Sequence, residues 1–397
     1  MKELSAVAEA VQASTTMAID AMYKKMRADG VDVIGFGAGE PDFDTPDPIK
    51  EAGITAIREN KTRYTPPAGI PELREAICSR LKADCGLHYA PSQVVVSSGA
   101  KHNLFIALQT LLNPGDEVIL PAPYWVSYYE LIKMAGGVPV VVHTTPDHGF
   151  RMTREQLEGA ITPKTKALIL NNPSNPTGMM YDEAGLRMVA QVCLASDLYV
   201  IADEIYYSLV YDGRAFVSFP SLGEEIKERT ILINGVSKSY AMTGWRIGYA
   251  VANEKIAKIM ANYLSHSTSA PSSVSQWAAL AALSGDQSKI QEMRKAFEER
   301  RDYLCSRMNQ MPGVCCIQPQ GAFYVIMGLD HLIGKTLHGV TIRNADDFAQ
   351  SFLEKGLVAV VPCTGFGAPN YVRWSYATSL ENIKVGLDRL EKFLAEG

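Results

Sequence analysis

The sequence predicts an α/β protein with a mostly parallel sheet flanked by helices, together with a smaller α+β domain. The first indication is a series of short runs, most of them nearly continuous in Val, Ile, Leu and Ala, which is typical of strands buried on both faces. The second is that helical stretches, such as 103–112 and 182–196, lie between several of these runs. The runs begin at Val94, Glu117, Val138, Lys166, Leu198, Thr230 and Arg246.

The length indicates more than one domain, because a single hydrophobic core stops growing at about 250 to 300 residues and this chain has 397. After Ser284 the pattern changes to a charged helix over 288–308, a strand over 321–327, a helix over 345–356 and a strand over 358–362. We expect an N-terminal segment, 1–45, that packs with the small domain, a large domain, 46–285, and a small C-terminal domain, 286–397.

The composition argues against nucleic acid and membranes as partners. The 38 Lys and Arg residues against 43 Asp and Glu give a net charge of -5, and no basic block is present. No segment approaches about 18 unbroken apolar residues, and the N-terminus resembles neither a secretory signal nor a transit peptide. Because the seven cysteines form no C-x-x-C pair, we expect no metal site and a cytoplasmic location.

The residues that follow the predicted strands are rich in polar and reactive side chains. They lie at 99–101, 124–125, 171–178, 203–206 and 237–238. Open parallel sheets bind ligands beyond the carboxyl ends of their strands. We therefore expect one cleft to collect these segments.

The segment GVSKSYAMTGWRIGYA, at 235–250, resembles the lysine signature of the class I aminotransferases of pyridoxal 5'-phosphate (PLP) fold type I. Similar motifs are GAGEPDFDTP at 37–46, RYTPPAGIPELREA at 63–76, NNPSNPTG at 171–178, ADEIY at 202–206 and VRWSYATS at 372–379. The chain is most similar to the bacterial aspartate aminotransferase branch. The resemblance implies a large domain with a mostly parallel seven-stranded sheet, and an enzyme that moves an amino group between an amino acid and a 2-oxo acid.

The resemblance also implies a role for each residue around the cofactor. Lys238 matches the lysine that forms a Schiff base with the cofactor aldehyde and afterwards shuttles the Cα proton. Asp203 matches the carboxylate that keeps the pyridine nitrogen protonated. Tyr206 and Asn175 match donors to the phenolic oxygen, and Trp125 matches the ring that stacks on the pyridine. Taken alone, an isolated lysine is usually a solvated surface charge, and these aromatic rings could be ordinary core packing.

A helix start and a guanidinium both suit a phosphate dianion. The residues that resemble the family's phosphate site are Gly99, Ala100, Lys101, Ser237 and Arg246. Tyr64 matches a tyrosine that reaches the phosphate of the neighbouring subunit. The resemblance therefore implies a homodimer with shared active sites.

The substrate residues implied by the resemblance are Gly39, Trp125, Asn175, Arg373, Lys101, Thr16 and Ser14. Arg373 matches the partner of the substrate α-carboxylate, which a planar guanidinium can bind through two hydrogen bonds, and the Gly39 amide matches a second contact. Lys101 matches the position that binds the distal carboxylate, with Ser14 and Thr16 as hydroxyl helpers. A ping-pong transamination between L-aspartate and 2-oxoglutarate follows.

Other activities stay open at this point. Thr16 and Lys101 also resemble branch members that accept prephenate, aromatic or alanine donors are possible, and the case for a dicarboxylate weakens if Lys101 only neutralises phosphate. A PLP lyase, such as a carbon-sulfur lyase or aminocyclopropane carboxylate synthase, is a second class, since the cofactor alone does not fix which bond breaks. A lyase would release pyruvate or ammonia without an acceptor. A PLP-binding transcription regulator would need a DNA-binding domain, for which the chain has no room.

Overall fold

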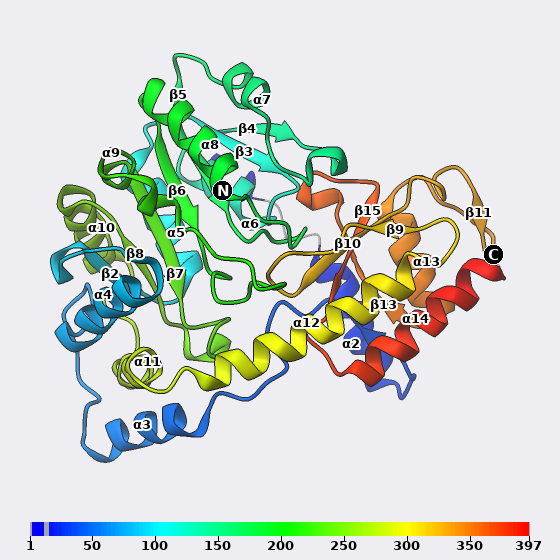
Figure 1. Cartoon of the computed structure of the whole chain (residues 1–397), viewed down its shortest axis with the longest axis horizontal. Coiled ribbons are helices and arrows are strands. Elements are labelled where there is room, and N and C mark those ends of the chain that lie inside the picture. Colours follow the sequence, from blue (N-terminus) through cyan, green and yellow to red (C-terminus); the bar gives the residue numbers. More distant parts are fainter. Residues whose placement is uncertain (1, 12–15, 397) are drawn as a thin grey trace.

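The computed structural model describes residues 2–11 and 16–396, and a seven-stranded sheet lies in the part drawn on the left of Figure 1. In spatial order the strands are β2 (Val94–Ser97), β8 (Gly248–Val251), β7 (Thr230–Gly235), β6 (Tyr199–Asp203), β5 (Thr165–Asn171), β3 (Glu117–Ala122) and β4 (Val138–His143). Only β8 runs antiparallel to its neighbours, β2 and β7. The predicted mostly parallel seven-stranded sheet is confirmed.

The direction of β8 follows from the connection that precedes it. Residues 236–247, all of them described, contain only the short helix η4 (Thr243–Trp245) between β7 and β8. A parallel connection usually crosses over through an α-helix that packs on a face of the sheet, and this segment contains no α-helix. The chain therefore returns beside β7 in the opposite direction, and this returning segment carries Lys238.

Helices cover both faces of the sheet, because alternate residues of a buried strand point to opposite sides. In β5, Ile169 packs in the cluster formed with α5 (Ala100–Leu111), α6 (Ser127–Met134) and α10 (Glu254–Ser267). Leu168 and Leu170 pack on the other side. The helices of that side and its periphery are α3 (Asp47–Arg58), α4 (Pro71–Cys85), α7 (Arg154–Gly159), α8 (Glu183–Ala195), α9 (Glu224–Glu228) and α11 (Ser273–Ser284).

Two local expectations are refined by the structure. The helix expected over 103–112 begins earlier, at Ala100, because Gly99 stands before it with a φ of 91° that ends the preceding extended segment. β4 is not buried on both faces as its apolar run suggested. It lies at the edge of the sheet, with Val138 and His143 exposed.

The C-terminal part contains the elements expected after Ser284. Its helices are α12 (Ser288–Met308), α13 (Ala345–Gly356) and α14 (Leu380–Ala395). An antiparallel sheet has the order β14 (Val361–Pro362), β15 (Tyr371–Ser375), β10 (Tyr324–Gly328) and β9 (Cys315–Cys316), with the hairpin β11 (Thr336–Leu337) and β12 (Val340–Thr341) beside it. The single strand expected over 358–362 is wrong, since β13 (Val358–Ala359) and β14 belong to different sheets.

The N-terminal segment contains α1 (Ala6–Glu9), α2 (Thr16–Ala28) and β1 (Ile34–Gly35). β1 pairs in parallel with β13, where Ile34 lies opposite Val358, and α2 packs against α13. The domain boundaries at 45 and 285 stay predictions. Among the described residues, no helix is long and apolar enough to cross a membrane.

Candidate active site

A cavity of about 800 Å³ lies where the carboxyl ends of β5, β6 and β7 meet the N-terminal and C-terminal parts of the chain. Its wall also includes the start of α5, the residues before α6, and residues of α2 and β15. The predicted site residues that line it are Gly39, Ala100, Lys101, Trp125, Asn175, Asp203, Tyr206, Ser237, Lys238, Arg246 and Arg373. The segments that follow the strands therefore do meet in one cleft.

Asp203 is the last residue of β6 and only 3% exposed. Its Oδ2 accepts a hydrogen bond of 2.6 Å from the Tyr128 hydroxyl, and its Oδ1 accepts one of 3.2 Å from the Ile205 amide. Burial raises the pKa of Asp203 to about 6, against the opposing effect of the Tyr128 hydrogen bond. A cation placed in the cavity beside this carboxyl would favour its ionised form.

Lys238 reaches the cavity from the segment between β7 and β8, and its Nζ donates to the carbonyl of Gly39. Burial lowers the pKa of Lys238 to about 8. Desolvation therefore makes the neutral, nucleophilic amine far more accessible than that of a surface lysine.

The start of α5 and Arg246 form a cationic end of the cavity. Gly99 precedes α5 without a side-chain cap, so the first N–H groups of the helix are free to bind an anion. The Arg246 guanidinium is packed so closely that a Cβ at Gly99 would lie 2.5 Å from its Nη2. A Cβ at Gly248 would lie 2.2 Å from the amide nitrogen of Ala100, so this approach to the backbone requires glycine at position 248, while the positive φ favours glycine at position 99.

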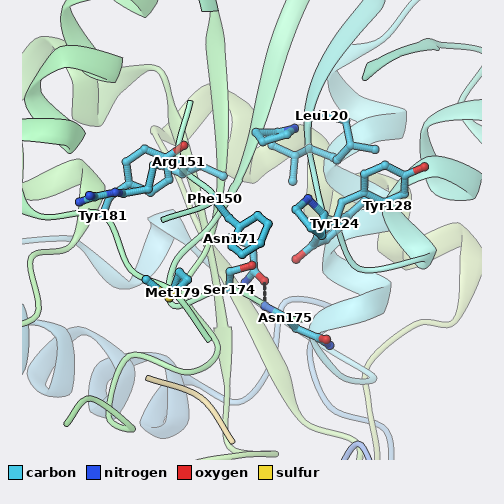
Figure 2. A pocket seen from close by; sticks show the side chains of 14 residues that line it. Leu120, Tyr124, Tyr128, Phe150, Arg151, Asn171, Ser174, Asn175, Met179 and Tyr181 are labelled. Atoms are coloured by element: carbon cyan, nitrogen blue, oxygen red, sulfur yellow. Dashed lines mark hydrogen bonds between the residues drawn. The ribbon is translucent and has the colours of Figure 1, made fainter. Parts of the chain in front are cut away.

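Asn175 borders both this cavity and a smaller one of about 30 Å³, which Figure 2 shows. The backbone N–H of Asn175 donates to Asn171 Oδ1 at 2.7 Å, and Asn171 Nδ2 donates to the backbone carbonyl of Asp203 at 2.9 Å. These bonds tie the segment 171–178 to the end of β6. The Asn175 side chain is thereby held against Arg373.

Arg373 lies in β15 and is 5% exposed. Its Nη1 donates to Asn175 Oδ1 at 3.0 Å, and its Nη2 donates to the Gly37 carbonyl at 3.1 Å. Its guanidinium carbon lies 4.4 Å from the centre of the Tyr324 ring. Among the described residues no carboxylate pairs with this buried cation, which leaves it suited to the carboxylate of a ligand.

Two tyrosines of the cavity wall were not identified from the sequence. The Tyr324 hydroxyl lies 3.1 Å from that of Tyr206, and Tyr128 bonds Asp203. Tyr324 follows GAF in the predicted strand 321–327, and Tyr128 follows Trp125 by three residues. For Tyr128 the nearby Trp125 was a signal, but Tyr324 is an isolated tyrosine in an apolar run, a pattern that predicts only core packing.

Other predicted residues lie at the margin of the cavity or outside it. The Lys101 amine lies 4.7 Å from the centre of the Trp125 ring, and burial together with the charge of Arg246 lowers its pKa. Tyr64 is fully exposed, at 102%, and does not line the cavity of its own chain. Ser14 lies outside the described residues, and Thr16 begins α2 with its side chain outside the described part.

The chemistry of these groups fits PLP. An amine with a lowered pKa can bond an aldehyde, a buried carboxylate can pair with a pyridinium nitrogen, and the start of α5 with Arg246 can bind a phosphate. All three face one cavity in an α/β fold whose ligand site lies at the carboxyl ends of the strands. Fold and site thus define a PLP-dependent enzyme.

Comparison with known proteins gives the family. The family described as aminotransferase class I and II matches residues 31–390. An aspartate aminotransferase from Bacillus sp. (strain YM-2) is 47% identical over 395 residues, which cover 99% of this chain and 100% of that relative. The chain belongs to the class I and II aminotransferases and is a PLP-dependent aminotransferase, as the resemblance predicted.

Solved structures agree with this assignment. The crystal structure of the aspartate aminotransferase from Rhizobium meliloti has a TM-score of 0.97 at 41% identity and covers 100% of both chains. The Thermus thermophilus aspartate aminotransferase with maleate has a TM-score of 0.93 at 41% identity and covers 99% of this chain and 100% of that one. The predicted PLP fold type I is confirmed.

Proposed function

We propose that this enzyme transfers the amino group of L-aspartate to 2-oxoglutarate in a ping-pong reaction. The observation that carries the proposal is Arg373, a buried and oriented guanidinium in the same cavity as the amine of Lys238. Every amino acid and 2-oxo acid substrate has the carboxylate that such a guanidinium binds. The names of relatives from Bacillus sp. (strain YM-2) and Bacillus subtilis, both aspartate aminotransferases at 47% and 46% identity, support aspartate as the donor.

In this proposal the bound cofactor supplies an aldehyde and an electron-withdrawing ring. Lys238 would hold the cofactor through its aldehyde group and would carry the proton of the substrate Cα. Asp203 would pair with the pyridine nitrogen and favour its protonated form. Tyr206 and Asn175 would donate to the phenolic oxygen, and Trp125 would pack against the ring. The support is that all five side chains line one cavity.

The cationic end of the cavity would hold the cofactor phosphate. The proposed ligands are the amides of Gly99 and Ala100, the side chains of Lys101, Ser237 and Arg246, and Tyr64 of the partner subunit. The fully exposed ring of Tyr64 supports a donation across a subunit interface. A homodimer with shared active sites is therefore part of the proposal. A cytoplasmic location is also proposed, because all seven cysteines are free thiols.

The substrate contacts follow from the same arrangement. Arg373 and the Gly39 amide bind the α-carboxylate, Trp125 and Asn175 border the bound substrate, and Lys101 binds the distal carboxylate. Ser14 and Thr16 are proposed as hydroxyl helpers. The support for Lys101 is the place of its amine beside Trp125, within the cavity that holds Arg373.

The experiment is an assay of purified protein with a panel of donors and acceptors. We expect a yellow protein that forms product from aspartate only when 2-oxoglutarate is present. In Lys238→Ala we expect turnover to fall by about 10²-fold to 10⁴-fold or more while the fold stays intact. Near-normal turnover of Lys238→Ala, or pyruvate and ammonia formed without an acceptor, would contradict the proposal. The panel includes prephenate, because relatives from Aquifex aeolicus and Cereibacter sphaeroides are named probable aspartate/prephenate and aspartate/prephenate aminotransferase.

A further inference from the structure

Tyr128 is a buried tyrosine, 2% exposed, whose hydroxyl donates to the carboxylate of Asp203. The O–O distance of 2.6 Å is in the short range that is typical of hydrogen bonds to charged oxygens. Tyr128 lies in the first turn of α6, 75 residues before Asp203, so this contact exists only in the folded chain.

The ring of Tyr128 is fixed from several sides. Its centre lies 5.3 Å from that of Trp125 in an edge-to-face contact, and the amide of Tyr128 donates to the Trp125 carbonyl at 3.0 Å. Tyr128 also lines both the main cavity and the smaller cavity of Figure 2. The short segment 125–128 therefore holds the Trp125 ring at the main cavity and the Tyr128 hydroxyl against Asp203.

The carboxylate of Asp203 needs such a donor, because a buried carboxylate without hydrogen bonds takes up a proton. Its oxygens are divided between two donors, the Tyr128 hydroxyl on Oδ2 and the Ile205 amide on Oδ1. The other titratable groups near Asp203 are Lys238, whose charge favours the ionised form, and the buried side chains of Glu204 and Tyr206.

We propose that Tyr128 is a positioning residue of the aminotransferase reaction: its hydroxyl holds the Asp203 carboxylate ionised and aimed at the pyridine nitrogen of the cofactor. The inference rests on the proposed role of Asp203 and deepens it. In this proposal Tyr128 acts through Asp203, to which its hydroxyl donates.

The test compares Tyr128→Phe with Tyr129→Phe. Tyr129 is the next residue of α6, its ring stacks on Tyr124, and it lines neither cavity. Both variants keep their rings and lose one hydroxyl. For Tyr128→Phe we expect PLP affinity, measured by equilibrium dialysis, and kcat to fall by about 10-fold to 100-fold, the scale of one hydrogen bond to a charged acceptor. KM for aspartate should change little. The acid limb of the kcat profile should move to higher pH, because Asp203 loses a bond that favours its ionised form.

A double-mutant cycle decides whether Tyr128 acts through Asp203. In an Asp203→Asn background, Tyr128→Phe should weaken PLP binding by no more than about twofold, because the ionised acceptor is already gone. Misfolding would instead lower affinity in both backgrounds. Equal effects in the two backgrounds, or a Tyr128→Phe protein that behaves like Tyr129→Phe, would overturn the proposal. A wild-type protein without PLP or transamination would instead overturn the proposed function.

Discussion

At the residue scale, burial acts on neighbouring charged groups in opposite directions. It raises the pKa of Asp203 to about 6 and of Glu204 to about 8, and it lowers that of Lys238 to about 8. Asp203 and Lys238 face the cavity, where a bound cofactor can compensate the cost. Glu204 points away and accepts hydrogen bonds from Ser218 Oγ at 2.6 Å and the Phe219 amide at 2.7 Å, so it fixes the chain at 218–219.

Glu204 should make stability depend on pH. With its pKa raised to about 8, against about 4.3 for an exposed glutamate, the folded chain holds a proton that the unfolded chain releases between these values. Stability therefore falls as pH rises through this window, by up to about 1.4 kcal/mol per pH unit. In Glu204→Gln we expect the Tm relative to wild type to rise between about pH 5 and pH 8 in thermal scans.

The control is Glu225→Gln, at an exposed position nearby on α9. The difference in Tm between Glu225→Gln and the wild type should not change with pH over the same range. A flat difference for Glu204→Gln as well would mean that Glu204 is ionised in the fold.

Lys101 decides substrate specificity if it contacts the distal carboxylate. Replacing it by Met should then raise the barrier for aspartate by roughly 2 to 5 kcal/mol, the scale for truncating one member of a desolvated charge pair. Alanine and phenylalanine, which lack that carboxylate, should lose much less in kcat/KM. Equal losses for all donors at saturating PLP would assign Lys101 to the phosphate alone.

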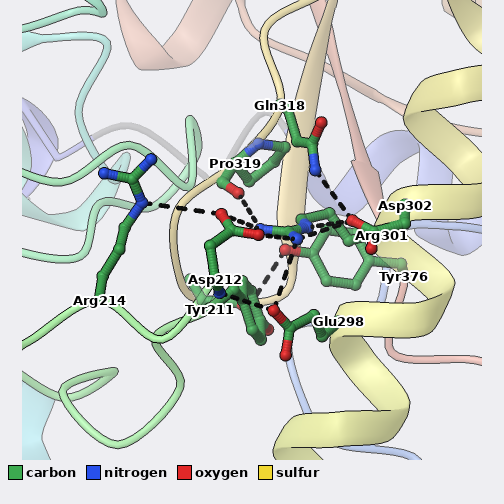
Figure 3. A network of polar contacts seen from close by, with 10 residues as sticks. Tyr211, Asp212, Arg214, Glu298, Arg301, Asp302, Gln318, Pro319 and Tyr376 are labelled. Atoms are coloured by element: carbon green, nitrogen blue, oxygen red, sulfur yellow. Dashed lines mark hydrogen bonds and ion pairs between the residues drawn. The ribbon is translucent and has the colours of Figure 1, made fainter.

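At the element scale, α12 is joined to the loop after β6 by a buried arginine (Figure 3). Arg301 is 0% exposed, donates to both carboxylate oxygens of Asp212 at 2.7 and 3.0 Å, and donates to the Pro319 carbonyl at 2.8 Å. Its guanidinium also lies 4.8 Å from the centre of the Tyr211 ring. The loop that follows Asp203 and contains Tyr206 is thus anchored to the C-terminal part of the chain.

Arg301→Lys should destabilise the protein by roughly 1.5 to 3 kcal/mol, because an ammonium cannot make the paired bonds to Asp212 and also reach Pro319. Urea unfolding gives the change in the free energy of unfolding. The matched control on the same helix is Arg307→Lys, whose partners Asp388 and Glu391 are exposed, and which should cost less than about 1 kcal/mol. Equal losses in the free energy of unfolding for the two variants would show that the buried contacts of Arg301 stabilise the protein no more than the exposed contacts of Arg307 do.

At the scale of the whole molecule, the active site depends on distant parts of the chain. Arg373 donates hydrogen bonds to Gly37, which lies 336 residues away in the sequence, and to Asn175, which lies 198 residues away. The cavity therefore exists only when N-terminal, central and C-terminal segments are assembled. The proposed dimer extends this dependence to a second copy, through the exposed ring of Tyr64.

Mixing two impaired variants tests the shared site. Tyr64→Ala and Lys238→Ala should each have low activity alone. After random exchange of subunits, roughly half of the dimers are hybrids with one intact site, so about a quarter of wild-type activity should return. Sedimentation should show a dimer. A fully active monomer, or a mixture without any recovery, would refute the shared site.

The sequence by itself determined the strands of the large sheet and the residues after them, because buried parallel strands and strand-end motifs are local patterns of adjacent residues. It also led to Lys238, Asp203, Asn175 and Arg373 through motifs, and all four line the cavity. The tertiary structure alone decided the antiparallel direction of β8, the edge position of β4 and the bond from Tyr128 to Asp203. It also decided the burial of Arg301 within the charged helix α12. These features depend on contacts between residues far apart in the chain, and such contacts leave no periodic signal in the sequence.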